Sequence, residues 1–236
     1  GYAVSLSADG SRVAIGAQYN NGNGPYAGHV RLYDWNGSAW VQLGADIDGE
    51  AAGDWSGYAV SLSADGSRVA IGAGNNDGNG TSAGHVRLYD WNGSAWVQVG
   101  ADIDGEAAGD YSGYAVSLSA DGSRVAIGAH LNSGNGNVAG HVRLYDWNGS
   151  AWVQLGTDID GEAAGDLSGW SVSLSADGSR VAIGAFLYDG NGVDAGHVRV
   201  YEGSTPVGII ENGFGTGLTV HPNPTSGPIS IALGQQ

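Results

Sequence analysis

Residues 1–17 read GYAVSLSADGSRVAIGA, and this stretch returns unchanged at residues 57–73 and 113–129. A fourth copy, at residues 169–185, differs only in Trp170 and Ser171. The copies are spaced by 56 residues each time. A fixed period of this length indicates a repeat architecture, in which each unit buries its apolar face against its neighbours.

Each unit carries the pattern of antiparallel strands. Apolar side chains alternate with small or polar ones along residues 2–6 and 13–17, which is the period-two signature of a strand. Two further strands are expected around residues 30–32 and 40–43. The sequence Asp9-Gly10 joins the first pair and Asn36-Gly37 joins the second. Such dipeptides favour type I′ hairpin turns, so we expect four strands in each unit.

Four-stranded units repeated in tandem are typical of propeller blades. We predict an all-β fold, a β-propeller built from 56-residue four-stranded antiparallel blades at residues 1–56, 57–112, 113–168 and 169–210. Stacking of the blades should bury large side chains between neighbours, and in the first unit these are Tyr2, Val4, Val13, Ile15, Trp35 and Trp40. Carbohydrate stacking is the alternative role for the tryptophans.

The fourth unit departs from the repeat after Tyr201, where residues 207–210 are compatible with a shorter last strand. Four blades could close as a small ring. We expect instead that they belong to a larger ring, with further blades before Gly1. Residues 211–217 then form a linker to a segment of different character at residues 218–236.

Composition excludes several partners. The chain has no cysteine, and its 24 acidic residues against 8 basic ones give a formal charge of −16. Nucleic acid is therefore an unsuitable partner, because phosphate binding needs basic surface patches. No apolar run approaches the ~20 residues that span a bilayer. A divalent cation or a neutral polar ligand fits this composition better.

The repeat resembles a known family over roughly residues 1–202. The residues Gly-Asp-Trp-Ser-Gly-Tyr-Ala-Val at 53–60, followed by Val-Ala-Ile-Gly-Ala at 69–73, resemble the FG-GAP repeat of integrin α-chain propellers and their bacterial relatives. Serine replaces the usual phenylalanine before glycine, and Gly74, His130 or Phe186 replaces the usual proline. The resemblance implies an integrin α-like propeller, and no ligand contact is transferred with it.

A second resemblance covers the tail. Residues 218–231 read LTVHPNPTSGPISI and look like the start of a type IX secretion sorting domain. This implies a protein of a Bacteroidota-type bacterium that is secreted or attached to the outer-membrane surface through that domain. A proline-rich linker leading into an ordinary domain is the alternative.

Antiparallel strands place the second turn of each blade and the segment between blades at one end. The inter-blade segment is acidic, and its carboxylates alternate around a glycine. Oxygen ligands in such a pattern suit Ca²⁺. The candidate metal ligands are Asp46, Asp48, Glu50 and Asp54, then Asp102, Asp104, Glu106 and Asp110, then Asp158, Asp160, Glu162 and Asp166. The alternative is a solvated acidic loop whose aspartates accept local backbone hydrogen bonds.

The second turn varies in sequence between units while its frame stays constant, as expected of a recognition surface or of neutral drift at exposed tips. Aromatic and apolar tips can anchor a partner. The candidate contact residues are Tyr19, Tyr26, His130, Leu131, Phe186 and Tyr188. His29, His85, His141 and His197 recur at one strand position, where we expect a structural hydrogen-bonding role.

We therefore expect a secreted or cell-surface propeller that is not an enzyme and that binds an extracellular glycan or protein in adhesion. An architectural spacer, or the non-catalytic part of a secreted hydrolase, is the alternative. An enzyme would need a catalytic group that breaks the repeat symmetry. Asp77, His130 and Asp194 are such singletons, and none has an evident catalytic partner in the sequence.

Overall fold

The computed structural model describes residues 1–202, which form strands and loops with no helix among them. The first sheet contains β1 (Ala3–Leu6), β2 (Arg12–Ala17), β3 (His29–Trp35), β4 (Trp40–Gln42) and β5 (Ile47–Asp48). The second contains β6 (Ala59–Leu62), β7 (Arg68–Ala73), β8 (His85–Trp91), β9 (Trp96–Gln98) and β10 (Ile103–Asp104). The third contains β11 (Ala115–Leu118), β12 (Arg124–Ala129), β13 (His141–Trp147), β14 (Trp152–Gln154) and β15 (Ile159–Asp160). The fourth contains β16 (Ser168–Leu174), β17 (Arg180–Ala185) and β18 (His197–Glu202).

Each sheet is an antiparallel meander in chain order, as predicted. The expected fourth strand is present in the first three sheets but is broken into two pieces, because β4 and β5 both pair with β3. Gly44 lies in the break with a φ of +77°. A Cβ atom there would come 2.9 Å from the ring of Trp91, so the glycine admits a tryptophan of the next sheet.

The hairpin turns differ from the predicted type. A type I′ turn needs positive φ at both central residues. In the structure only the glycines adopt it, with φ of +70° at Gly10 and +95° at Gly37. The Gly10 amide bonds the Ser7 carbonyl, and Asp9 Oδ1 accepts the Ser11 amide at 2.9 Å. The Ser11 amide and the hydroxyls of Ser7 and Ser11 all donate to the Asp9 carboxylate and hold its pKa at about 2, and they stabilise the turn without a positive φ at Asp9.

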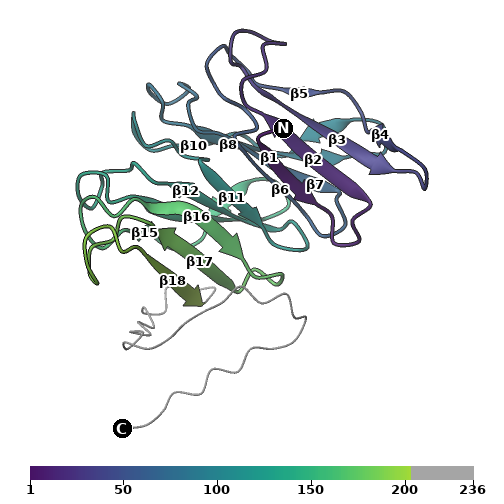
Figure 1. The fold of residues 1–236 in the computed structure, drawn as a ribbon. Coiled ribbons are helices and arrows are strands. Elements are labelled where there is room, and N and C mark those ends of the chain that lie inside the picture. Colours follow the sequence, from purple (N-terminus) through teal and green to yellow (C-terminus); the bar gives the residue numbers. More distant parts are fainter. Residues whose placement is uncertain (203–236) are drawn as a thin grey trace, which may run out of the picture.

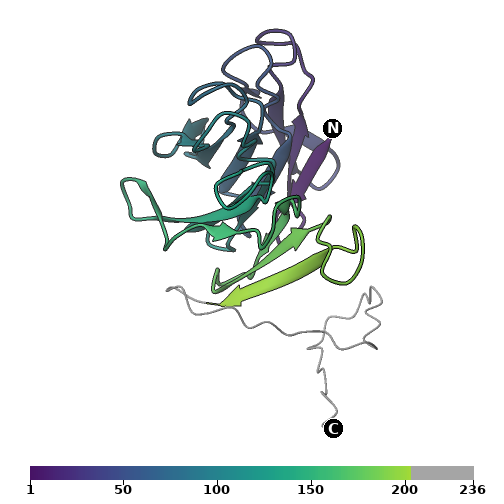
Figure 2. The same ribbon diagram turned by 90° about the vertical axis from the view of Figure 1, so that its left-hand side faces the viewer.

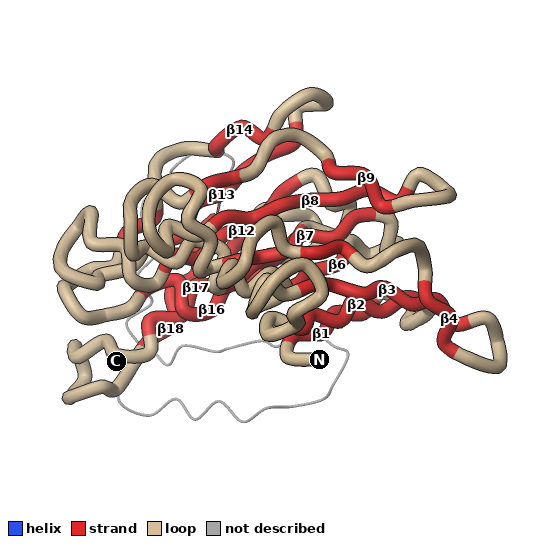
Figure 3. Tube along the Cα trace, turned by 90° about the horizontal axis from the view of Figure 1, so that it is seen from above, coloured by secondary structure: helices blue, strands red, loops and turns tan. Residues whose placement is uncertain are grey.

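The four sheets follow one another in chain order as the blades of an open β-propeller arc (Figures 1 and 2), with the strands lying between two groups of loops (Figure 3). The inner strands β1, β6, β11 and β16 are neighbours along the arc. The predicted all-β fold of repeated antiparallel blades is confirmed.

The same three hydrogen bonds join consecutive sheets. At the first interface, the Arg12 guanidinium donates to the Gly66 carbonyl at 2.9 Å, and the Ala8 amide donates to the Ala64 carbonyl at 2.8 Å. The Leu62 amide donates to Ser5 Oγ at 3.0 Å. Equivalent bonds recur at the next two interfaces. The interface between blades is therefore a repeated structure in itself.

Apolar packing between sheets follows the same pattern. Val30 and Leu32 of the first sheet pack with Val60 and Leu62 of the second sheet in one buried cluster. The backbones come closest at glycines, since a Cβ atom at Gly16 would lie 2.1 Å from the Gly57 carbonyl oxygen. Because the repeat places glycine on both sides of this contact, the sheets can approach closely enough to bury the valines and leucines.

Several side chains of the first unit are exposed in the structure, because no described sheet lies against that face. Val4 is 69% exposed, whereas Val60 at the same repeat position is 9% exposed. Tyr2, Trp35 and Trp40 are also exposed. Val13 and Ile15 are only partly buried. Blade packing of tryptophan does occur further along, where Trp96 Nε1 donates to the Leu43 carbonyl at 3.0 Å.

Three predictions lie outside the described residues. These are the last strand at residues 207–210, the linker at residues 211–217 and the sorting domain at residues 218–236.

Candidate functional site

The β2–β3 loops and the segments between blades lie at the same end of the molecule, as the antiparallel order requires. Gly28 in the first such loop bridges to Ser56 in the segment between blades. The Trp55 amide donates to the Tyr26 carbonyl at 3.1 Å. The variable loops and the acidic segments thus form one continuous surface, which we call the loop-bearing face.

Aromatic rings form a continuous row at the start of the inner strands. The row consists of Tyr2, Tyr58, Tyr114 and Trp170, one from each blade, and we call it the aromatic arc. Successive ring centroids are 4.9, 4.5 and 4.8 Å apart. Each residue directly follows the glycine that ends an inter-blade segment, so the arc lies at the loop-bearing end. Its rings are half-buried or exposed.

The hydroxyl groups of the arc are also connected. The Tyr2 hydroxyl donates to the Tyr58 hydroxyl at 3.2 Å. Burial, together with hydrogen bonds to Tyr114 and Tyr2, raises the pKa of the Tyr58 phenol. The arc therefore offers neutral hydroxyls beside flat apolar rings, a combination that suits polar ligands with apolar faces.

Two of the predicted contact residues extend the arc into the first variable loop. Tyr19 and Tyr26 pack edge to face at 5.7 Å, and Tyr19 contacts Trp55 at 5.8 Å. Trp55 in turn stacks on Tyr58 at 6.5 Å. Tyr19 and Tyr26 are more than half exposed. A further exposed candidate, Phe186, packs on Trp170 at the other end of the arc, with the ring centroids 4.4 Å apart.

The other three candidate contact residues, His130, Leu131 and Tyr188, are less exposed than expected for the tip of a loop. His130 is only 4% exposed, so the expectation of an exposed tip is wrong for it. Its ring centroid lies 3.9 Å from that of Tyr114 and 4.9 Å from that of Trp170. Burial lowers the pKa of His130 to about 4, and the neutral imidazole supports the arc from below. Leu131 and Tyr188 are half-buried, and Tyr188 packs on His197 at 3.8 Å.

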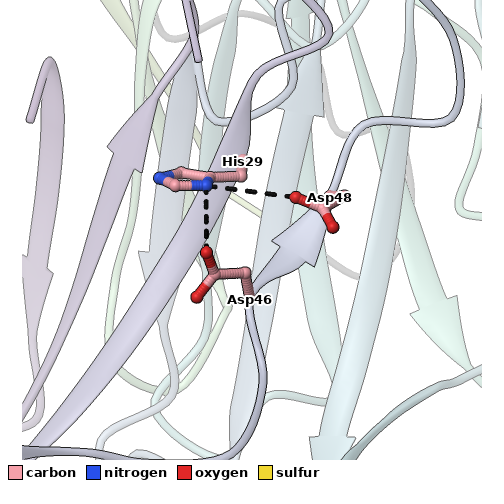
Figure 4. A group of neighbouring side chains, drawn as sticks. All are labelled: His29, Asp46 and Asp48. Atoms are coloured by element: carbon pink, nitrogen blue, oxygen red, sulfur yellow. Dashed lines mark ion pairs between the residues drawn. The ribbon is translucent and has the colours of Figure 1, made fainter. Parts of the chain in front are cut away.

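The acidic segments gather around the repeated histidines. In the first blade, His29 Nδ1 lies 3.3 Å from an Asp46 carboxylate oxygen and 4.0 Å from one of Asp48 (Figure 4). The strand β5 holds Asp48 beside β3, because Asp48 is the direct pairing partner of His29, and Asp46 directly precedes β5. The three side chains could hold a metal ion.

The later clusters draw their ligands from two blades. Glu50 reaches the next blade, where its carboxylate lies 3.9 Å from His85 Nδ1 and 3.5 Å from the Arg87 guanidinium. Asp102 completes this group at 3.7 Å from His85. A third group of the same kind contains Glu106, His141 and Asp158. Glu162 pairs with His197 and Arg199 in the fourth blade.

The predicted ligands thus do not form one cage per segment. Carboxylates that are close in sequence are separated in the fold. Asp48 lies in β5 beside its own blade's β3, whereas Glu50 reaches a histidine of the next blade. Asp104 and Asp160 contribute backbone carbonyls to arginines of the following blade. Asp54, Asp110 and Asp166 are buried away from the clusters, where their carboxylates accept the amides of Ala51, Ala107 and Ala163. For these last three, the alternative of local backbone hydrogen bonding applies.

One arginine faces the two carboxylates of each cluster, so the negative charge is only partly compensated. Burial lowers the pKa of His29, His85 and His141, while the neighbouring carboxylates oppose that shift. Arg31 hydrogen-bonds Asp46 at 2.8 Å and lowers the pKa of that carboxyl. Ca²⁺ prefers oxygen ligands, whereas transition metals also accept an imidazole nitrogen. A set of one imidazole and two carboxylates is therefore suited to a transition metal too.

Sequence reasoning missed the aromatic arc. Tyr2 was expected to pack between blades, whereas its ring lies at the start of β1, on the loop-bearing face. The available signal was an aromatic residue directly after glycine at residues 2, 58, 114 and 170. Every repeat therefore places a ring at the point where neighbouring blades are closest.

Comparison with known proteins supports the fold. No sequence family and no curated protein matches the chain. Hydrazine synthase of Kuenenia stuttgartiensis is similar in structure, with a TM-score of 0.53, 14% identity, and coverage of 89% of this chain and 47% of that chain. A Bacteroides uniformis protein described as a putative 6-phosphogluconolactonase has a TM-score of 0.56 at 10% identity, with coverage of 85% and 50%.

The chain therefore spans about half the length of these two structures, and at such identities the likeness concerns the fold alone. Residues 1–202 contain no helix that could cross a membrane. The comparisons identify the chain as a protein with an all-β propeller-like fold.

Proposed function

We propose that this protein is a non-catalytic binding or adhesion module that recognises an extracellular glycan or protein on its loop-bearing face. The aromatic arc carries the proposal, since it joins one ring from each blade into a single surface. Exposed Tyr19, Tyr26 and Phe186 lengthen that surface on both sides. Aromatic residues in such clusters are frequent anchors in recognition.

The ring geometry favours a glycan over a protein as the first ligand to test. Sugar rings have an apolar face that packs on aromatic rings and hydroxyls that hydrogen-bond to tyrosine. The rings lie 4.5–4.9 Å apart and are tilted by 37–50° to one another, so they form a continuous row across the four blades. Such a row suits an elongated glycan chain, which can contact several blades at once.

The placement of the singleton side chains supports a non-catalytic role. Asp77 accepts the Ser82 amide at 2.7 Å, as Asn21 accepts the Tyr26 amide in the first loop. Asp77 therefore accepts the same backbone hydrogen bond within its loop as Asn21 does in the first blade. His130 is enclosed by aromatic rings, where no acid or nucleophile accompanies it among the contacts of the described residues. Both similar structures carry enzyme names, so an activity screen belongs with the binding test.

The test is binding of the purified chain to a glycan array and to extracellular matrix proteins. The double substitution Tyr58→Ala with Tyr114→Ala should weaken binding by about 30-fold or more, the effect of losing ~2 kcal/mol at an interface. Trp35→Ala is the matched control, because Trp35 is an exposed aromatic at the opposite end of its blade. Melting curves verify folding of each variant. Binding that survives in the double variant would contradict the proposal.

Calcium at the acidic clusters is a further part of the proposal. Bound metal would fix Asp46 and Asp48 beside His29 and so stiffen the surface next to the arc. Saturation at 100 times the dissociation constant would stabilise the fold by ~2.7 kcal/mol per site, or roughly 5–11 °C. The triple substitution Asp46→Ala, Asp102→Ala and Asp158→Ala removes one carboxylate from each cluster and should abolish that rise. Equal melting temperatures in calcium, zinc and chelator would argue against a metal.

We also propose that the protein is secreted or held at the outer-membrane surface of a Bacteroidota-type bacterium. The support is the sequence of residues 218–231 alone. Deleting residues 218–236 in such a host should retain the protein inside the cell, as measured by protease treatment of whole cells. If the deletion variant still reached the surface, the sorting role would be wrong.

The second candidate function is an architectural spacer. The uniform interfaces between blades favour it, because they form a rigid unit that needs no ligand. A chain that binds nothing on the array, but whose removal from a longer protein lowers the stability of its neighbour, would favour this function over recognition.

A further inference from the structure

Two of the histidine clusters lie between described blades and share one arrangement. In the first of them, Glu50 comes from the segment that leaves the first blade, whereas His85 and Asp102 belong to the second. His85 Nδ1 lies 3.9 Å from Glu50 Oε2 and 3.7 Å from Asp102 Oδ2. The cluster between the second and third blades repeats both distances. Three possible ligand atoms therefore converge at each of these two places.

Surrounding side chains hold the carboxylates of these clusters in position. Glu50 Oε1 pairs with the Arg87 guanidinium at 3.5 Å, and Asp102 Oδ1 accepts a hydrogen bond from Gln98 Nε2 at 2.6 Å. Arg143 and Gln154 hold the carboxylates of the next cluster in the same way. The second oxygen of each carboxylate is left facing the imidazole. Outer partners of this kind orient the ligands of bound metal ions.

The two imidazoles are buried without a hydrogen-bond partner among the described residues. The side chain of His85 is 2% exposed and that of His141 is 1% exposed. Nε2 of each ring is enclosed and unpartnered. The distances from Nδ1 to the carboxylates exceed the length of about 3.2 Å at which an N–H···O bond is still good. Buried polar groups normally have a partner, and an ion bound at Nδ1 would provide one where the carboxylates converge.

We propose that these two clusters bind a divalent transition-metal ion, such as zinc, that links consecutive blades. The inference rests on the metal part of the proposed function and names the class of ion and two of its sites. One imidazole nitrogen and two carboxylates form a ligand set that suits such ions better than Ca²⁺. Zinc bonds of about 2.1 Å in a tetrahedral site place the ligand atoms about 3.4 Å apart, so closure on the ion needs shifts of a few tenths of an ångström. The carboxylates are 27–44% exposed, which leaves a further position open to water.

The test measures binding of zinc, cobalt and calcium ions, each supplied alone to the purified chain, by titration calorimetry. The visible absorption of bound cobalt reports its ligands. We expect zinc to bind at least about tenfold more tightly than calcium. Asp102→Asn together with Asp158→Asn should weaken zinc binding by at least about tenfold and remove the cobalt absorption. Melting curves without metal verify that each variant is folded.

The matched control is Asp104→Asn together with Asp160→Asn. These substitutions remove the same two charges from the same two segments, but the carboxylates lie outside the clusters and the backbone carbonyls bond arginines of the following blade. Zinc affinity and the cobalt absorption should be retained in this control. Zinc should also raise the melting temperature of the control and not that of the cluster variant.

The outcomes separate this inference from the proposed function. Equal loss of zinc binding in both double variants would mean general attraction to an acidic surface and would overturn the inference. Calcium binding tighter than zinc binding would also overturn it, while supporting the calcium part of the proposed function. If no ion binds, both metal proposals fail. Glycan binding through the aromatic arc is measured separately, with the variants of Tyr58 and Tyr114.

Discussion

Replacement of Gly72 by alanine tests how closely the blades approach. A Cβ atom at Gly72 would lie 2.0 Å from the Gly113 carbonyl oxygen of the next blade and 2.9 Å from its carbonyl carbon. Ordinary contacts between heavy atoms are about 3.5 Å. The sheets must therefore separate locally by roughly 1.5 Å. The obstacle is backbone and not a flexible side chain, so it cannot turn aside.

The energetic effect follows from two opposing contributions. Overpacking of a well-packed core costs about 1–3 kcal/mol, and a contact against backbone belongs at the upper end. The lower entropy of an unfolded chain with alanine returns about 0.4–1 kcal/mol. We expect a net loss of about 2 kcal/mol. For a chain of this size, that corresponds to a melting temperature lower by roughly 4–8 °C.

The assay is differential scanning calorimetry of Gly72→Ala beside Gly74→Ala. Gly74 is a matched control, because it is buried just beyond the same strand, yet a Cβ atom there would lie 3.6 Å from its nearest neighbouring atom. Gln18, His130 and Phe186 occupy its position in the other repeats. Gly74→Ala should leave the melting temperature unchanged or slightly higher. Equal melting temperatures for the two variants would refute the argument for close approach at glycine.

Two further predictions concern single side chains. His130 has a folded pKa of about 4 against 6.5 when unfolded, so stability should fall as pH drops from 6.5 to 4, by roughly 3 kcal/mol. His130→Gln, which copies Gln18, should lose less of its melting temperature between pH 7 and pH 4.5, and an equal loss would refute the buried neutral imidazole. Trp96→Phe removes the hydrogen bond to the Leu43 carbonyl and should lower the free energy of unfolding by about 1 kcal/mol in urea denaturation. Trp40→Phe, at an exposed ring, should change it by less than about 0.5 kcal/mol, and comparable losses would contradict the role of that bond.

The repeat and most of its strands could be predicted from the sequence alone. Identical 17-residue stretches define the number of full units, and the alternation of residues 13–17 defines which side chains share a face. Both signals are local, because a strand's periodicity is independent of its surroundings. The turn type was predicted wrongly. Hydroxyls of Ser7 and Ser11 donate to the Asp9 carboxylate and stabilise the turn, so Asp9 needs no positive φ.

How side chains from different blades meet depends instead on the folded arrangement of the sheets. Asp46, Glu50 and Asp54 are close in sequence, yet one joins its own blade's histidine, one crosses to the next blade and one is buried in its loop. The aromatic arc likewise exists only because consecutive blades place residues 56 positions apart within 5 Å. Exposure of Val4 and burial of Val60, which have identical sequence surroundings, depend only on whether another sheet lies alongside. Local patterns encode strands, whereas contacts between sheets depend on distances that no local pattern contains.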